Sequence, residues 1–186
     1  MPASVGRAQA RIGLLGNPGD LYGGNVLAAT IDTFETVATV TDTVFYAPAS
    51  FQPDVADLQR LAIARVAPSK GAISLGLTTD VPVQSGLSGS SAILLATLRA
   101  LDTHLDLSLR PLEMAQIAWD IEREELGIVA GPQDRVIQAL GGLQYMDFSS
   151  PDEIGTHEPL DPDLLPPLLL AWPKEPGTPS GDVHRA

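Results

Sequence analysis

The sequence predicts a domain that mixes strands and helices, and three observations lead to this prediction. The first part of the chain contains short runs rich in Val, Thr and Ile, which are typical of strands. The middle has apolar residues at three- and four-residue spacing, which indicates helices. Between them, a loop of glycine and serine links a predicted strand to an apolar helix. With 186 residues, of which 44% are hydrophobic, the chain is long enough for one domain with a substantial core.

Charge and composition narrow the possible functions. The chain has 23 acidic and 11 basic residues, a net charge of -12, and no cluster of Lys or Arg. This balance disfavours nucleic acid and anionic membranes as partners and favours small-molecule chemistry. The absence of cysteine excludes disulfides, thiolate zinc sites and a cysteine nucleophile. No apolar run approaches the roughly 18 residues of a membrane span, and the N-terminus has no apolar signal region, so we expect a cytoplasmic protein.

The expected elements follow one another along the chain. Strands are predicted at residues 11–16, 26–31, 36–40 and 44–46, the last three of them antiparallel, and the first ends in a turn of Asn, Pro, Gly and Asp. A helix is predicted at residues 55–66 and a strand at residues 72–81. The next helix, which follows the glycine and serine loop, should end near Leu101.

The loop at residues 82–92, PVQSGLSGSSA, is the clearest candidate for a binding site. Gly86 and Gly89 allow a positive φ and a close approach of the backbone to a ligand. The free N–H groups and the positive dipole end of the following helix favour an anion, most often phosphate. The alternative is a flexible loop that only caps a helix, and composition alone favours neither. Hydroxyls and N-cap candidates are supplied by Ser88, Ser90 and Ser91.

A helix predicted at residues 109–126 carries a carboxylate in an unusual place. At 100° per residue, Glu122 lies on the apolar face with Trp119 and Leu126, whereas Arg123 lies on the polar face. A charge on an apolar face is costly unless it is paired or bound to a metal. We therefore expect a partner or a polar cleft at Glu122, although a carboxylate near a helix end could also reach solvent.

The segment Gly131 to Arg135 is predicted to open another helix, with Pro132 in its first turn, and Gly141 and Gly142 to close it. Asp134 also falls in the first turn. There the helix dipole favours an ionised carboxylate, which a proton acceptor needs, but the same placement is an ordinary helix-stabilising device. A strand is expected at residues 143–148.

The composition changes at residue 151, because eight of the 16 prolines lie in the last 36 residues. We expect no helix there, one possible strand at residues 168–172, and a linker from Lys174 onward. The expected organisation is a domain at residues 1–150 and a proline-rich tail at residues 151–186.

Three segments, in this order, resemble the GHMP kinase superfamily, named for galactokinase, homoserine kinase, mevalonate kinase and phosphomevalonate kinase. ARIGLLGNPGDLYGG at residues 10–24 is similar to the first family motif, and PVQSGLSGSSA is similar to the phosphate-loop motif. GIVAGPQDRVIQALGGLQYMDF at residues 127–148 resembles the segment with the catalytic aspartate. The details of these motifs are closest to glucuronokinase-like sugar kinases, and heptose kinases come next.

The resemblance implies an α/β (α+β) fold related to ribosomal protein S5 domain 2, with a mixed sheet and packed helices. It implies ATP-dependent phosphorylation of a sugar hydroxyl, with the anomeric hydroxyl of a uronic acid as the first candidate. Three alternatives remain: another sugar kinase of the superfamily such as a heptose kinase, a decarboxylase of the same fold, and a non-catalytic fragment that binds a nucleotide or a sugar.

The resemblance also implies roles for residues. Asp134 would take or hold the proton of the sugar hydroxyl, and Arg11 would neutralise charge during transfer. Ser91 and Glu122 match the family's Mg²⁺ ligands. The residues that match the ATP-binding loop are Pro82, Gly86, Leu87, Ser88, Gly89, Ser90 and Ser91.

Three residues are candidates for binding the sugar. Asp20 matches the position that binds sugar hydroxyls, and Asn17 lies near it. Arg135 is a candidate for a substrate carboxylate, from its position and charge only. Asn17 and Pro18 replace the Glu-His pair of galactokinases, which argues against galactose.

The family's C-terminal domain has no counterpart in these residues, so we expect a fragment or a truncated reading frame that is a poor kinase alone. Its tail carries apolar residues that would lack a packing partner, which should favour self-association. These residues are Leu168, Leu169, Leu170 and Trp172.

Overall fold

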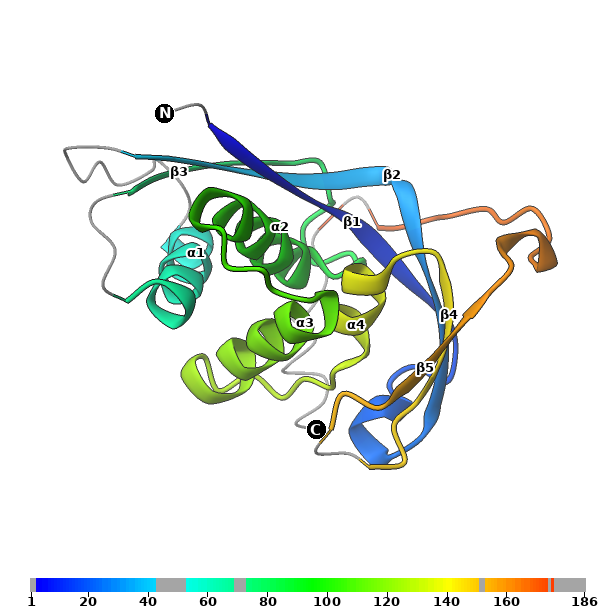
Figure 1. Ribbon diagram of the computed structural model, residues 1–186. Coiled ribbons are helices and arrows are strands. Elements are labelled where there is room, and N and C mark those ends of the chain that lie inside the picture. Colours follow the sequence, from blue (N-terminus) through cyan, green and yellow to red (C-terminus); the bar gives the residue numbers. More distant parts are fainter. Residues whose placement is uncertain (1–2, 43–52, 69–72, 151–152, 174, 176–186) are drawn as a thin grey trace.

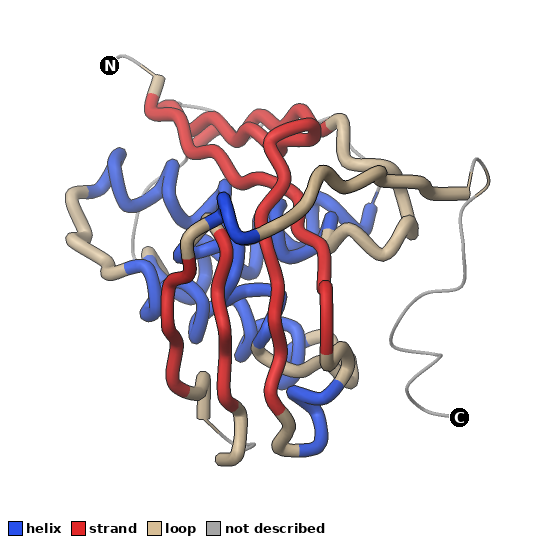
Figure 2. The backbone as a smooth tube through the Cα atoms, turned by 90° about the vertical axis from the view of Figure 1, so that its right-hand side faces the viewer, coloured by secondary structure: helices blue, strands red, loops and turns tan. Residues whose placement is uncertain are grey.

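The computed structural model describes residues 3–42, 53–68, 73–150, 153–173 and 175. One five-stranded sheet has helices packed against one of its faces (Figure 1; Figure 2). Every described strand pair is antiparallel, whereas a mixed sheet was expected. The strands are β1 (Ser4–Leu15), β2 (Asn25–Asp42), β3 (Ile73–Thr79), β4 (Leu143–Asp147) and β5 (Thr156–Leu160). The helices are α1 (Pro53–Val66), α2 (Gly89–Leu105), α3 (Pro111–Asp120), which a π-helical turn (Ile121–Glu125) continues, and α4 (Gln133–Leu140). Short 3₁₀ turns lie at Gly19–Tyr22 and Pro162–Leu164.

The strand β2 is the centre of the sheet. It pairs with β1 along one edge and with both β3 and β4 along the other. The two strands expected at residues 26–31 and 36–40 are therefore one strand, and that prediction is wrong. The cause is a bulge: Gln9 pairs with Glu35 and the next residue, Ala10, with Ile31, so three residues of β2 are left over. A bulge bends a strand without ending it. The strand expected at residues 44–46 lies outside the described residues.

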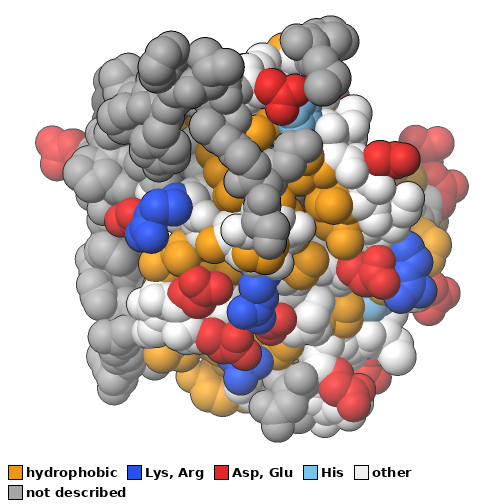
Figure 3. Space-filling model, turned by 60° about the vertical axis from the view of Figure 1, so that its left-hand side comes forward, with side chains coloured by type: hydrophobic (Ala, Val, Ile, Leu, Met, Phe, Trp, Pro, Cys, Tyr) orange, Lys and Arg blue, Asp and Glu red, His pale blue; other side chains and the backbone are white. Residues whose placement is uncertain are grey.

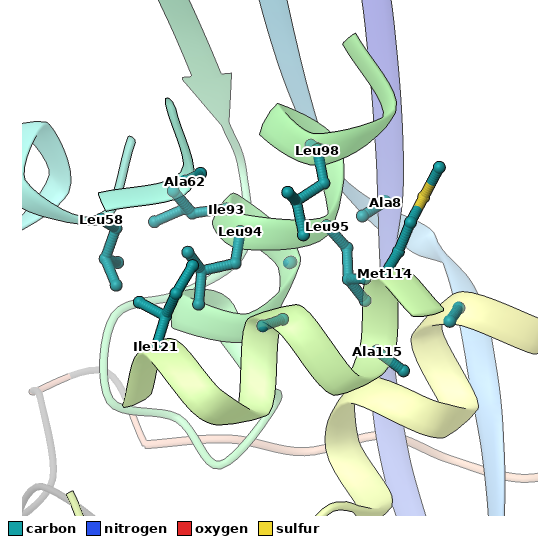
Figure 4. Packing of buried hydrophobic residues seen from close by; sticks show 14 of the residues in the cluster. Ala8, Leu58, Ala62, Ile93, Leu94, Leu95, Leu98, Met114, Ala115 and Ile121 are labelled. Atoms are coloured by element: carbon teal, nitrogen blue, oxygen red, sulfur yellow. The ribbon is translucent and has the colours of Figure 1, made fainter. Parts of the chain in front are cut away.

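The helix α2 forms the middle of the core. Its residues from Ser91 to Leu98 are all buried, and it packs on β1 and β2 on one side and on the other helices on the other (Figure 4). At the closest point, a Cβ atom on Gly6 of β1 would lie 2.1 Å from the carbonyl oxygen of Ala96. This close contact fixes the position of α2, and with it the loop at its N-terminal end.

The predicted helix at residues 109–126 is only partly correct. Regular α-helix ends at Asp120, and in the π-helical turn the N–H of Leu126 donates to the carbonyl of Ile121, five residues back. This wider turn breaks the 100° spacing. Glu122 is 1% exposed, as expected for the apolar face, but Leu126 is 36% exposed. The predicted helix at residues 55–66 is confirmed as α1, although the side chain of Val55 lies outside the described residues. α4 begins at Gln133, so Pro132 is its cap and not a first-turn residue.

The tail differs from expectation in two ways. Residues 168–172 form no strand, whereas the polar segment Thr156–Leu160 is the edge strand β5, which pairs with β4. Alternation of apolar residues is absent from β5, and its Pro159 is tolerated because an edge strand has one unpaired side. The segment after β5 crosses the sheet (Figure 2). There Trp172 makes an edge-to-face contact with Phe34, with ring centroids 5.1 Å apart.

The surface is mixed in charge. On the described part of the face in Figure 3, acidic and basic side chains lie beside one another with apolar side chains between them. Among the described residues, none of the helices is long and apolar enough to span a membrane.

Candidate active site

The glycine and serine loop runs from the end of β3 into the first turn of α2. Gly86 and Ser88 have φ values of 78° and 61°, in the left-handed region. Gly89 does not need a positive φ; it is the first residue of α2, which corrects the expectation for this glycine. A Cβ atom on Gly86 would meet nothing within 4 Å. The loop therefore borders open space at Gly86.

Ser88 occupies the N-cap position of α2 but does not act as a cap through its side chain. Its hydroxyl instead donates to Oδ2 of Asp134 at 2.7 Å. The first N–H groups of a helix have no acceptor within the helix. Because the cap side chain is turned away from them, the start of α2 keeps its capacity to bind an anion.

Asp134 and Arg11 meet at this loop. Arg11 comes from β1, and its Nε and Nη2 atoms lie 2.7 Å and 2.6 Å from Oδ1 of Asp134. Its Nη1 donates to the carbonyl of Gly86 at 3.0 Å. Asp134 lies in the first turn of α4, as predicted. The two predicted catalytic residues, 123 positions apart in sequence, are thus brought together with the loop.

Glu122 is held by two side chains. Its Oε1 accepts a hydrogen bond from Ser90 at 2.9 Å, and its Oε2 forms a buried ion pair with Arg135. A partner or a polar cleft was expected at this carboxylate, and the partner is Arg135. Arg135 is itself 5% exposed and donates to the carbonyl of Gly131 at 2.7 Å. Burial lowers the pKa of Arg135 to about 9, so it remains a cation at neutral pH.

This arrangement bears on two of the sequence-based expectations. Arg135 already has a carboxylate partner within the chain and is not available to a substrate carboxylate without breaking that pair. The hydroxyl that donates to Glu122 belongs to Ser90, whereas the hydroxyl of Ser91 is buried without a hydrogen-bond partner. An unpartnered oxygen in the first helical turn suits a ligand, but both oxygens of Glu122 are occupied. A Mg²⁺ ion at Glu122 would have to share the carboxylate with Arg135.

Asp20 and Asn17 both accept hydrogen bonds from Gln133. Asp20 is 2% exposed; its Oδ2 accepts from the backbone N–H of Gln133 at 3.1 Å, and its Oδ1 has no hydrogen-bond partner. Burial is the main cause of a raised pKa at this carboxyl. Asn17 is exposed and accepts a hydrogen bond from the side chain of Gln133. Sequence reasoning missed Gln133, because only its place next to Asp134 could have drawn attention to it.

Metal-binding residues are sparse in the described part of the chain, which contains no group of three or more His, Cys, Asp or Glu side chains able to hold an ion. A cation at this loop would therefore depend on oxygen atoms of a bound ligand in addition to those of the protein. This is the usual arrangement for Mg²⁺ with a phosphate substrate.

The family model for the GHMP kinases N-terminal domain matches residues 55–142. The chain carries a GHMP kinase N-terminal domain. The matched range contains the glycine and serine loop, Glu122, Asp134 and Arg135. Arg11, Asn17 and Asp20 come before it, and the fold brings them to the same place.

Curated relatives of this GHMP kinase domain include several sugar kinases. Glucuronokinase 1 of Arabidopsis thaliana is 37% identical over 96% of the chain, and probable glucuronokinase 2 of the same plant is also 37% identical over 96% of it. The chain spans 59% and 58% of the lengths of these two relatives. A D-glycero-alpha-D-manno-heptose 7-phosphate kinase of Campylobacter jejuni is 44% identical over 40% of the chain and 22% of its own length.

Solved structures agree on the fold of the GHMP kinase domain. A D-glycero-D-manno-heptose 1-phosphate kinase of Bacteroides thetaiotaomicron is 28% identical, with a TM-score of 0.74 over 86% of this chain and 60% of that one. A mevalonate kinase has a TM-score of 0.67 over 84% of this chain and 56% of that one, at 14% identity, which shows a shared fold alone.

Proposed function

We propose that this domain takes part in ATP-dependent phosphorylation of a sugar hydroxyl, with the anomeric hydroxyl of a uronic acid as the preferred acceptor. One observation carries the proposal: the carboxylate of Asp134 is held by Arg11 and Ser88 directly beside the open N-terminal end of α2. The names of the glucuronokinase relatives support the choice of sugar.

The loop from Pro82 to Ser91 is the proposed site for the nucleotide phosphates. The N–H groups at the start of α2 would donate to phosphate oxygens, and Gly86 leaves space for them. Mg²⁺ bound with the phosphates would supply positive charge, with Ser91 as a protein hydroxyl that has no other partner and Glu122, which accepts from Ser90, as a candidate carboxylate. Because Arg135 neutralises Glu122, we place most of the Mg²⁺ coordination on the phosphates and water.

The proposed chemistry is mainly a matter of positioning. The sugar oxygen forms a bond to the terminal phosphorus of ATP, the bond from that phosphorus to the bridging oxygen of ADP breaks, and the hydroxyl proton passes to Asp134. Arg11 reaches both Asp134 and the loop, so it lies where negative charge develops. Asp20, with one unpartnered oxygen, would accept a hydrogen bond from another sugar hydroxyl.

Asp134→Asn tests the proposal because it keeps the shape of the side chain and removes its charge. We expect nucleotide binding to persist and phosphoryl transfer to fall by more than about tenfold, a barrier increase above roughly 1.4 kcal/mol. Binding is measured on the 186 residues by calorimetry. Transfer is measured on the same chain and on a chimera in which the remaining length of Arabidopsis glucuronokinase 1 follows it.

The matched control is Asp57→Asn, which removes a carboxylate from the exposed surface of α1. Asp134 has no catalytic role if its amide variant keeps more than about a tenth of the wild-type rate. A heptose phosphate in the substrate panel separates the uronic acid from the second candidate, which the heptose kinase relatives favour.

The exposed apolar residues after β5 lead to a separate proposal. Leu164, Leu168 and Leu169 are 72%, 55% and 95% exposed. We propose that the domain at residues 1–150 is the catalytic unit and that the segment from residue 151 mediates weak self-association of the isolated chain. The ATP requirement of the proposed reaction fits a cytoplasmic location.

A further inference from the structure

A cavity of about 380 Å³ lies beside Asp20, outside the set of residues that hold Asp134. Its walls are Asp20 and Leu21 from the first 3₁₀ turn, Trp119 and Arg123 from the end of α3 and the π-helical turn, and residues 127–131. Asp20 lies close enough to Asp134 and Arg11 for their charges to act on its carboxyl, so the cavity borders the proposed reaction site. The roles proposed above use only Asp20 among these wall residues.

Arg123 is the cation of this cavity. Its guanidinium carbon lies 4.4 Å from the ring centroid of Trp119, in a cation–π contact. The ring is fixed in turn, because Trp119 is 2% exposed and its Nε1 donates to the carbonyl of Ala130 at 2.7 Å. Among the described residues Arg123 forms no ion pair. Arg65 differs, because it pairs with Asp120 and Glu124 beside the same turn.

The lining of the cavity also offers an acceptor. Asp20 is buried and its Oδ1 has no hydrogen-bond partner. Gly131 lets the backbone pass close to Asp20, because a Cβ atom at this position would lie 2.1 Å from Oδ2 of Asp20. The lining of the cavity thus includes both a guanidinium that stacks on Trp119 and a carboxylate with an unsatisfied oxygen. Its complement is a small molecule with both an anionic group and a hydroxyl.

We propose that Arg123, held by Trp119, binds the carboxylate of the sugar acid while Asp20 accepts a hydrogen bond from one of its hydroxyls. This inference rests on the proposed function and names the residue that selects an acidic sugar. Arg123 is suited to the role because its planar fork can donate two hydrogen bonds to one carboxylate. Arg135, the candidate from sequence, is buried in its pair with Glu122. In a chain of net charge -12, an unpaired arginine facing a cavity gives an anion a local site of opposite charge.

Binding of three sugars to the 186-residue chain tests the proposal: glucuronate, glucose as the neutral analogue and glucose 6-phosphate as a phosphate-bearing one. Arg123→Gln should weaken glucuronate binding roughly ten- to a hundredfold and leave glucose binding unchanged. Arg60→Gln, which removes an exposed arginine from α1, is the matched control and should change neither. An unaltered melting temperature and unaltered binding of an ATP analogue show that the Arg123 variant is folded.

Tryptophan fluorescence gives a second readout. In a Trp172→Phe background Trp119 is the remaining tryptophan, and glucuronate should alter its emission when Arg123 is present and not after Arg123→Gln. Equal glucuronate affinity in wild type and Arg123→Gln would overturn this inference and leave the proposed function intact. Tighter, Arg123-dependent binding of glucose 6-phosphate would overturn the assignment to a carboxylate. If the wild type binds the ATP analogue but no sugar, the proposed function itself fails.

Discussion

The ion pair between Glu122 and Arg135 joins two elements at their ends, the π-helical turn after α3 and the first turn of α4. Both side chains are almost fully buried, so each charge depends on the other for compensation. Removing one partner of such a pair leaves an uncompensated charge in the interior. The pair therefore holds α4, and with it Asp134, against the end of α3.

Glu122→Gln should destabilise the domain by about 3 kcal/mol, because Arg135 keeps its charge and loses its counter-charge. Urea unfolding measures the loss. Glu113→Gln is the control, since it breaks an exposed pair with Arg110 and should change little. If Glu122 also contributes to Mg²⁺ binding, the variant will need more Mg²⁺ for nucleotide binding. Greater stability in the Gln variant would show that Arg135 does not depend on this carboxylate.

Asp20 should make the stability of the domain depend on pH. Burial raises the pKa of this carboxyl above its ordinary value of 3.8, so the fold favours the protonated form. Its favourable contribution is present below that ordinary value and is lost as the pH rises through the raised pKa. Asp20→Asn removes this loss. The advantage of the Asn variant in free energy of unfolding should therefore grow from pH 4 toward neutral pH.

Denaturant unfolding at several pH values measures this difference. An advantage that stays constant with pH would mean that Asp20 has the same pKa in the folded and unfolded states. The same variant should bind sugar more weakly, because the amide replaces one acceptor oxygen by a donor. Asp20 would then lower the stability of the domain and strengthen sugar binding, a trade-off common at functional sites.

At the scale of elements, the packing of α2 on β1 decides where the phosphate-binding loop lies. Gly6→Ala would place a methyl group 2.1 Å from the carbonyl oxygen of Ala96 and should cost about 1–3 kcal/mol of stability. Because α2 must move to relieve the contact, affinity for an ATP analogue should fall as well. Gly19→Ala is the control, because its nearest neighbour would be at 3.6 Å. Thermal unfolding and calorimetric binding test both, and equal stability of the two variants would contradict the prediction.

Elements with a strong local pattern could be predicted from sequence, and those shaped by tertiary contacts could not. The loop followed by α2 was predicted from its glycines and its apolar residues, and α1 from its spacing. The continuity of β2 was not, because its bulge at residues 32–34 is a register shift against β1, which is distant in sequence. The π-helical turn shifted Leu126 to the surface because one wider turn invalidates the 100° rule.

The site shows the same division. The position of Asp134 in a first turn could be read from the sequence. Its contacts with Arg11 and Ser88 span 123 and 46 positions, and only the folded chain brings them together. For the same reason Arg135 was expected to face a substrate, although it faces Glu122. The cavity at Trp119 and Arg123 had no signal of its own, because both residues fit an ordinary amphipathic helix.

At the scale of the whole molecule, the exposed leucines after β5 should affect behaviour in solution. Leu169 is 95% exposed, so Leu169→Ser removes apolar surface without removing a buried contact. We expect the wild-type chain to associate with rising concentration and to bind a hydrophobic dye, and the variant to do both less. Light scattering after size exclusion measures association. A wild-type chain that remains monomeric at every concentration would contradict the proposed self-association.

The long strand β2 has a consequence for how the domain opens. Its backbone groups are bonded to β1, β3 and β4, which come from the start, the middle and the end of the described domain. Residues 27–29 of β2 lie between β1 and β4, and residues 36–40 lie between β1 and β3. Because these two stretches are paired on both sides, their amides become accessible to solvent only when the sheet opens. In deuterium exchange those amides should be the slowest, and their rate should report global unfolding, whereas the edge amides of β5 should exchange through local opening.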